Sequence, residues 1–149
     1  MNKISVVRFV LVYFDKVKMG LSQYDIKEET MTSKKVCLNV WRNAHAVVTA
    51  VQGEIAARWI EVSLYDHDKR LDISEKTAAI YMTKPDKTIV YNTCEILDAK
   101  NGLISVELTS QMSAVAGTIC DCEIHIIDKN GSLLKILGLT IIIDRSLED

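Results

Sequence analysis

Alternation of apolar and polar residues runs through most of the chain from residue 35 onward. In Thr77–Thr83, for example, Ala78, Ile80 and Met82 fall on one face and the residues between them fall on the other. A period of two places successive side chains on opposite faces of a β-strand, so the pattern predicts half-buried strands. The segments that show it are Lys35–Trp41, Arg58–Tyr65, Thr77–Thr83, Ile104–Leu108 and Thr118–Asp128.

A tight turn is predicted directly after one of these segments. Thr77–Thr83 and Thr88–Tyr91 flank Lys84–Lys87. Pro85, the only proline of the chain, fixes φ at the value that the second residue of a type I turn requires. Asp86 after it is suited to accept a hydrogen bond from the nearby backbone. We therefore expect a β-hairpin over residues 77–91.

Glycine marks three further turns or bends. The pairs Asn101-Gly102 and Asn130-Gly131 predict hairpin turns, because both residue types tolerate positive φ. Two nearly continuous apolar runs follow, Leu133–Leu137 and Leu139–Ile143, and we expect them to be central strands or to pack against a partner. Gly138 between them predicts a bulge or bend.

One segment predicts a helix. Thr109 or Ser110 is suited to cap its start, residues 111–116 provide one or two turns, and Gly117 would end it. The whole pattern amounts to about eight short strands and one short helix. It is typical of an all-β fold, an antiparallel β-sandwich of the jelly-roll or immunoglobulin-like type.

Residues 1–30 differ in character from the rest of the chain. The apolar segment Ile4–Phe14 precedes the mostly polar segment Asp15–Thr30. We therefore expect an N-terminal extension or linker over residues 1–30 and a β-sandwich domain over residues 31–149. Ile4–Phe14 is too short to span a membrane, is interrupted by Arg8 and is followed by no small-residue cleavage site. Neither an export signal nor a membrane anchor is expected.

Composition and charge exclude some classes of protein. The chain has 149 residues, of which 48% are hydrophobic, and a net charge of -2. It lacks the basic face that nucleic-acid binding requires, so no nucleic-acid partner is expected. Of the four cysteines, Cys120 and Cys122 share one face of a predicted strand. We expect buried free thiols rather than a disulfide framework, because a chain of this length has core enough without bridges.

The sequence holds few patterns suited to catalysis or metal binding. The triplet Asp66-His67-Asp68 contains metal-binding residue types, but in an extended segment His67 would point away from both carboxylates. A solvated turn is therefore the preferred interpretation. A nucleophile made of Cys94 or Cys120 with His125 conflicts with the predicted burial of the thiols and the predicted exposure of the imidazole. We expect no catalytic, cofactor-binding or metal-binding residues, and a protein that is not an enzyme.

Four aromatic residues fall on strand faces opposite the most apolar ones. They are Trp41, Trp59, Tyr65 and Tyr81. A row of exposed rings binds sugars by stacking or anchors another protein. Coverage of this second face, by the other sheet or by residues 1–30, would instead explain the rings as packing. Both interpretations stay open at the level of sequence.

Seven stretches, taken in order, resemble one known family. They are Gly53–Arg58, Val62–Asp66, Leu71–Ser74, Tyr81–Thr88, Asn101–Ile104, Leu108–Gln111 and Ala116–Thr118. Their series is similar to the N-terminal domain of phage upper baseplate proteins and covers about residues 31–149. The family usually has glycine at the position of Lys87, and we expect lysine to be tolerated there in a type I turn.

The resemblance implies a structural role in the virion. Such domains are β-sandwich adaptors that fix receptor-binding proteins or tail fibres to the tail-tip hub, and they have no catalytic residues. The expected partners are the distal tail protein, the receptor-binding protein and further copies of the chain. The expected location is the virion tail, assembled in the bacterial cytoplasm. The alternative is a carbohydrate-binding β-sandwich that uses Trp41, Trp59, Tyr65 or Tyr81 as a stacking platform.

Overall fold

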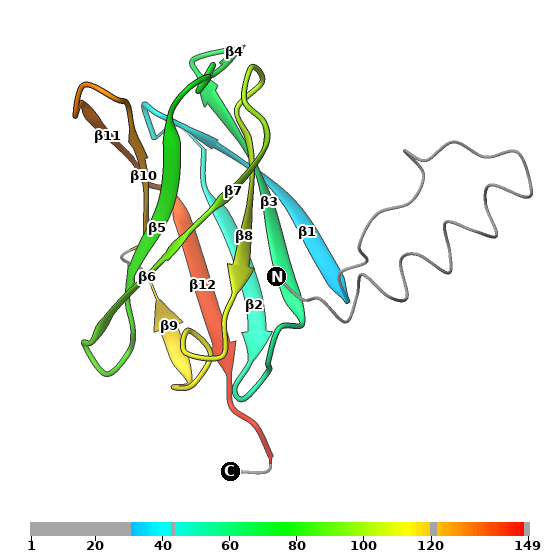
Figure 1. The fold of residues 1–149 in the computed structure, drawn as a ribbon. Coiled ribbons are helices and arrows are strands. Elements are labelled where there is room, and N and C mark those ends of the chain that lie inside the picture. The colour runs from blue at the N-terminus through cyan, green and yellow to red at the C-terminus, as the bar shows by residue number, and fades with distance from the viewer. Residues whose placement is uncertain (1–30, 43, 120–121, 148–149) are drawn as a thin grey trace, which may run out of the picture. The chain divides into compact units, whose positions relative to one another are not determined.

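The computed structural model of the protein describes residues 31–42, 44–119 and 122–147 (Figure 1). The predicted extension over residues 1–30 and the thiol of Cys120 lie outside them. The described residues form twelve strands and no helix, which confirms the all-β class. The strands are β1 (Thr32–Asn39), β2 (Ala46–Val51), β3 (Arg58–Asp66), β4 (Lys69–Arg70), β5 (Thr77–Thr83), β6 (Ile89–Thr93), β7 (Glu95–Asp98), β8 (Leu103–Leu108), β9 (Gly117–Ile119), β10 (Cys122–Ile127), β11 (Leu133–Ile136) and β12 (Leu139–Asp144).

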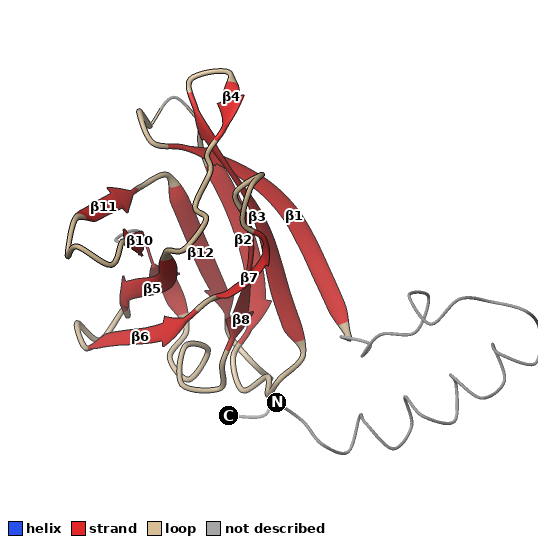
Figure 2. Cartoon of the chain, turned by 45° about the horizontal axis from the view of Figure 1, so that its top comes forward, coloured by secondary structure: helices blue, strands red, loops and turns tan. Residues whose placement is uncertain are grey.

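Three sheets enclose one apolar core (Figure 2). The first has the strand order β1-β3-β8-β7 with β4 paired to β3, the second β11-β10-β5-β6, and the third β2-β12-β9. Most neighbouring strands are antiparallel, as predicted, but β1 is parallel to β3 and β2 is parallel to β12. The predicted β-sandwich is confirmed, with these two parallel pairs added to it.

The alternation of apolar residues correctly predicts which strand faces are buried. In β5, the side chains of Ala78, Ile80 and Met82 are buried in the core. The same holds for every second residue of β3 and β8, the two inner strands of the first sheet. Burial of these faces supplies the main driving force for folding, since each buried aliphatic side chain contributes about 1.5–3 kcal/mol.

The predicted hairpin over residues 77–91 is confirmed by β5, β6 and the turn between them. The N–H of Lys84 donates to the carbonyl oxygen of Thr88 at 2.8 Å, and the N–H of Lys87 donates to that of Lys84 at 2.8 Å. Asp86 accepts a hydrogen bond from the backbone N–H of Thr88 at 3.1 Å, as its side chain was expected to do. Pro85 and Asp86 therefore form the centre of a type I turn.

Lys87 differs from its expected role in this turn. Its φ is 75°, which lies in the left-handed region that favours glycine. A three-residue hairpin loop consists of a type I turn followed by one left-handed residue, and Lys87 occupies that final position. Glycine, which the resemblance implies at this position, would adopt this φ without strain, whereas lysine is accommodated with strain.

The predicted helix over residues 109–117 is wrong, because this segment forms consecutive turns. The N–H groups of Met112 and Ser113 both donate to the carbonyl oxygen of Thr109, at 3.0 and 3.2 Å. The carbonyl oxygen of Ser113 is used by the N–H of Gly53 at 3.1 Å. In a segment this short, too few hydrogen bonds form to offset the free-energy cost of helix nucleation. Contacts to a neighbouring loop determine its backbone conformation instead.

Thr118–Asp128 is not the single long strand that its alternation predicts. It divides into β9 and β10, which belong to different sheets. Gly138 marks a second crossing, between β11 and β12, and confirms the predicted bend with a φ of 114°. A Cβ at this position would lie 2.6 Å from the carbonyl oxygen of Ala44, so only glycine fits. Strands that switch sheets in this way form the corners of sandwiches.

Candidate interaction surfaces

Trp41 is the most exposed of the four predicted aromatic contacts, with 64% of its surface accessible. It lies after β1, and its indole N–H donates to Asp66 Oδ1 at 2.8 Å. This hydrogen bond is the main reason that the pKa of Asp66 is lowered. The ring centroid of His67 lies 5.3 Å from that of Trp41. Trp41 is thus an exposed ring whose orientation is held by a charged partner.

Trp59 and Tyr65 lie on the outer face of β3, towards its two ends, and both are half-buried. The guanidinium carbon of Arg70, in the short strand β4, lies 5.1 Å from the centroid of the Tyr65 ring. This distance suits a cation–π contact. Tyr65 and Trp41 therefore belong to one end of the first sheet, because Asp66, the partner of Trp41, directly follows Tyr65.

Tyr81 lies in the second sheet, in a cluster of rings that the sequence did not predict. Its ring stacks on Tyr91 of β6 at a centroid distance of 5.0 Å and on His125 of β10 at 4.1 Å. His125 was expected to be exposed, but its accessible fraction is only 9% because Tyr81 covers it. Its Nε2 lies 2.8 Å from Glu123 Oε1. The cross-strand register, which places Tyr81 opposite both Tyr91 and Glu123, explains this cluster.

The four predicted aromatic residues do not form one platform. Three of them, Trp41, Trp59 and Tyr65, belong to or follow strands of the first sheet, and Tyr81 belongs to the second. Sugar binding by a single row of all four rings would need them on one surface. A role of the individual rings in contacting a partner protein stays a prediction.

Asp66, His67 and the cysteines are the side chains that the sequence offered for metal or thiol chemistry. No group of three or more His, Cys, Asp or Glu residues in the described part of the chain is placed to hold a metal ion. Asp66 and His67 contact each other at 2.9 Å, in contrast to the expected divergence. Cys37 and Cys94 are free thiols, of which Cys37 is exposed and Cys94 is buried. The side chain of Cys122 is buried as well. Burial raises the pKa of Cys94 to about 12, so its thiolate is scarce at neutral pH.

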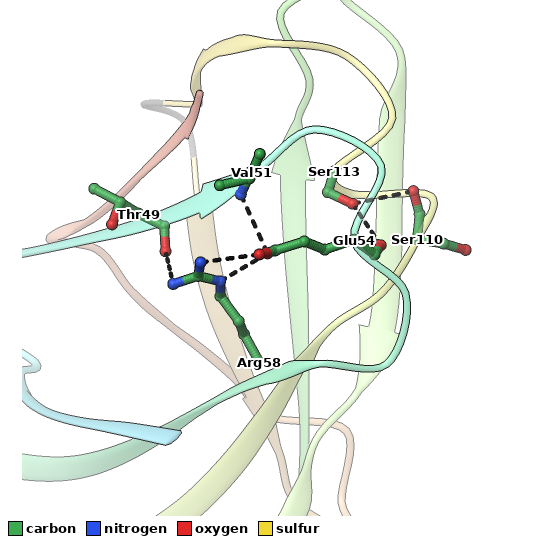
Figure 3. Close-up of polar contacts among 6 residues, drawn as sticks. All are labelled: Thr49, Val51, Glu54, Arg58, Ser110 and Ser113. Carbon is green, nitrogen blue, oxygen red and sulfur yellow. Dashed lines mark hydrogen bonds and ion pairs between the residues drawn. The ribbon is translucent and has the colours of Figure 1, made fainter. Parts of the chain in front are cut away.

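A charged pair fixes the loop between β2 and β3 (Figure 3). Arg58 Nε and Nη2 donate to the two carboxylate oxygens of Glu54 at 2.7 and 2.9 Å. Glu54 Oε1 also accepts from the backbone N–H of Val51 at 3.1 Å, and Arg58 Nη1 donates to the carbonyl oxygen of Thr49 at 3.3 Å. The hydrogen bond from Arg58 is the main cause of the lowered pKa of Glu54.

The same loop is tied to the turns that replace the predicted helix. The hydroxyl of Ser113 donates to the carbonyl oxygen of Glu54 at 3.0 Å (Figure 3). Gly53, Glu54 and Arg58 belong to one stretch of the family resemblance, and the segment 108–111 to another. These motif residues therefore position loops at one end of the sandwich.

A cleft of about 460 Å³ separates the second sheet from the bend at Gly138. Met82, Ile89 and Leu139 contribute apolar side chains to its lining. Arg42 and Glu123 contribute opposite charges. Such a mixture resembles the surfaces with which proteins contact one another.

The family model of the BppU N-terminal domain matches residues 23–149. Among solved structures, the N-terminal domain of phage TP901-1 ORF48 is similar with a TM-score of 0.65 and 11% identity, covering 76% of this chain and 99% of that chain. CopC from Methylosinus trichosporium OB3b gives a TM-score of 0.41 and 9% identity over 72% of this chain and 89% of that chain. A comparison with curated proteins gave no match. Among the described residues, no helix has the length and hydrophobicity to cross a membrane.

Proposed function

Because the chain belongs to the BppU N-terminal domain family, a structural family of the phage baseplate, we propose that it is an adaptor domain of the tail. In this role it links the receptor-binding apparatus to the tail hub through protein–protein contacts. The family match over residues 23–149 is the observation that carries the proposal. The sandwich supports it, since a rigid frame with loops tied at one end holds partner surfaces in fixed positions.

The proposed partners follow from the position of an adaptor. One face contacts the distal tail protein at the hub, and another contacts the receptor-binding protein. Further copies of the chain complete the assembly as a homo-oligomer. The proposed role is non-enzymatic, and its location is the virion tail after assembly in the bacterial cytoplasm. The division into an extension over residues 1–30 and a domain over residues 31–149 remains part of the proposal.

Trp41 is the best placed of the predicted aromatic residues to anchor a partner. Exposed tryptophans are strong binding residues, and a side chain already held in one orientation loses little entropy on binding. The hydrogen bond to Asp66 supplies that orientation. A partner that covers Trp41 would therefore gain affinity with little loss of side-chain entropy.

The proposal is tested by mixing the full chain with the distal tail protein of the same phage. We expect the two to co-elute in size-exclusion chromatography with light scattering. Trp41→Ala is expected to weaken the complex at least tenfold without changing the melting temperature, and Trp41→Phe, which keeps a ring, should lose less. A strict monomer without affinity for distal tail or receptor-binding protein would contradict the adaptor role.

A further inference from the structure

The outer edge of β6 is open to pairing with another strand. β6 is the last strand of the second sheet, and no described strand pairs with its outer side. Both views place it at the margin of the sandwich (Figure 1, Figure 2). Ile89 and Tyr91 present exposed side chains there, with accessible fractions of 71% and 58%. The edge thus combines available backbone with apolar surface.

The register shows which backbone groups are available. The carbonyl oxygen of Thr88 accepts from the N–H of Lys84, which directly follows β5, and the N–H of Cys94 donates to the carbonyl oxygen of Ala78 in β5. Alternate residues of a strand direct their N–H and C=O groups to the same side, so those of Ile89, Tyr91 and Thr93 point away from β5. The N–H of Thr93 is covered only by the side chain of its neighbour, Asn92, at 3.1 Å.

The other outer strands carry features that discourage pairing. Proteins protect sheet edges with charged residues, bulges, short strands or covering groups. Thus β1 carries Lys34 and Lys35, β11 carries Lys135, and β7 has a bulge between Ile96 and Asp98. On β2, the side chain of Arg58 donates to the carbonyl oxygen of Thr49, and that of Glu54 accepts from the N–H of Val51. The edge strand β9 has only three residues. β6 is also short, and the side chain of Asn92 covers one of its outward N–H groups, that of Thr93, but the strand carries no charged residue and no bulge.

The sequence of β6 is complementary to itself. Its five residues, Ile89-Val90-Tyr91-Asn92-Thr93, carry no charge, so an antiparallel copy brings no like charges together. Centred on Tyr91, such a pair places Tyr91 opposite Tyr91 and Ile89 opposite Thr93. Every outward N–H and C=O group of both strands then has a partner, and the stack of Tyr81 on Tyr91 continues across the junction.

We propose that β6 is the interface for a second copy of this chain, which joins the two second sheets into one continuous sheet across a two-fold axis. The occupant is a second copy because the strand is neutral and matches itself in register, and symmetric pairing uses the same patch on both subunits. A five-residue strand pair is small, so the dimer is weak and depends on concentration. This inference rests on the homo-oligomer included in the proposed function.

Cross-linking tests the register directly. In the full chain with Cys37 and Cys120 replaced by serine, Tyr91→Cys places two thiols opposite each other, with Cα atoms about 5.5 Å apart, within reach of a disulfide. Thr93→Cys is the matched control, because its two copies would lie about 13 Å apart along the strands. We expect rapid oxidation to a dimer for Tyr91→Cys and little for Thr93→Cys. Equal rates for the two variants would overturn the inference.

A charge at the centre of the edge tests the interface in solution. Sedimentation over a concentration series is expected to show a dimer for the parent chain and at least a tenfold higher dissociation constant for Tyr91→Lys, since two lysines would face each other. Val47→Lys, at an exposed apolar position of β2, whose backbone is hydrogen-bonded by the side chains of Arg58 and Glu54, is expected to leave the dimer unchanged. Circular dichroism confirms that each variant is folded.

The outcomes separate this inference from the adaptor role. A parent chain that is monomeric but binds the distal tail protein overturns the β6 dimer alone. If Tyr91→Lys then also abolishes that binding, the edge belongs to a different protein, and the second copy is again overturned. A dimer lost in Tyr91→Lys supports the inference even if no tail protein binds, a result that would contradict only the adaptor role.

Discussion

Five non-glycine residues among those described adopt left-handed backbone conformations, and each lies in a turn or bend. They are Arg42, Ala56, His67, Glu75 and Lys87. An L-residue in this region is strained by about 1–2 kcal/mol, because its Cβ approaches the backbone carbonyl. The strands that flank each turn require this geometry, and their packing holds it. Strain at the residue scale is therefore a consequence of register at the scale of the sheet.

Replacement of Lys87 by glycine is expected to stabilise the protein. Lys87→Gly relieves the strain at φ 75°, while the added freedom of glycine in the unfolded chain offsets part of the gain. The free energy of unfolding should rise by about 0.5–1 kcal/mol, measured by urea denaturation. Lys100→Gly, at a turn lysine without positive φ, should instead lower it slightly. A loss of stability in Lys87→Gly would contradict the assigned backbone strain.

At the scale of elements, side chains between the strands determine how the loops lie. Glu54 and Arg58 hold the β2–β3 loop, and Ser113 connects that loop to the turns after β8. The contact of Ser113 with Glu54 joins segments that are 59 residues apart in sequence. Loops without regular structure acquire a defined conformation when such hydrogen bonds satisfy their backbone groups. The family motifs therefore mark loop contacts as well as strands.

The Glu54–Arg58 pair is expected to contribute stability that depends on pH. Folding lowers the pKa of Glu54, so its contribution is fully present above the unfolded-state pKa of about 4.3 and is lost as pH falls through the lower folded-state value. Glu54→Gln should cost about 1 kcal/mol at pH 7, since the pair is partly solvated, and nothing comparable once Glu54 is protonated.

Urea denaturation of Glu54→Gln and of the parent chain, from pH 7 down to pH 2.5, measures this difference. Glu75→Gln is the matched control, because Glu75 pairs with Lys129 where both side chains are 74% exposed. The control should change stability by less than about 0.5 kcal/mol at every pH. A loss in Glu54→Gln that is independent of pH would show that the carboxylate charge is not the cause.

At the scale of the whole molecule, a contact between two single residues joins the second sheet to the third. Pro85, in the β5–β6 turn of the second sheet, lies against Gly117, the first residue of β9 in the third sheet. A Cβ at Gly117 would lie 2.8 Å from Pro85 Cγ, closer than real contacts allow. Both residues belong to the motifs of the family resemblance. The glycine is required for the close approach of the hairpin to β9.

Substitution of Gly117 is expected to separate these sheets locally. Gly117→Ala combines the clash with Pro85 and a φ of 138°, and should lower the free energy of unfolding by more than about 2 kcal/mol. Gly131→Ala is the matched control, since φ is 90° there but no atom lies within 4 Å. It should cost only about 1 kcal/mol of backbone strain. Thermal melting measures both, and equal losses would contradict the contact with Pro85.

The sequence by itself determined the strands, their buried faces and most of the turns. These features depend on local physics: a period of two separates the faces of β3, β5 and β8, and residues such as Pro85 and Asp86 direct the chain within a few positions of themselves. The family resemblance could be recognised for the same reason, because its motifs are largely turns and strand ends.

Only the tertiary structure decided how those strands are arranged. Alternation along Thr118–Asp128 is the same for one strand or two, so it could not reveal the crossing between sheets. His125 has a polar neighbourhood in sequence, yet the ring of Tyr81 from another strand buries it. The parallel pairs and the open edge of β6 likewise depend on which strands become neighbours. Pairing is a long-range choice, settled by burial of the whole core, and no local pattern encodes it.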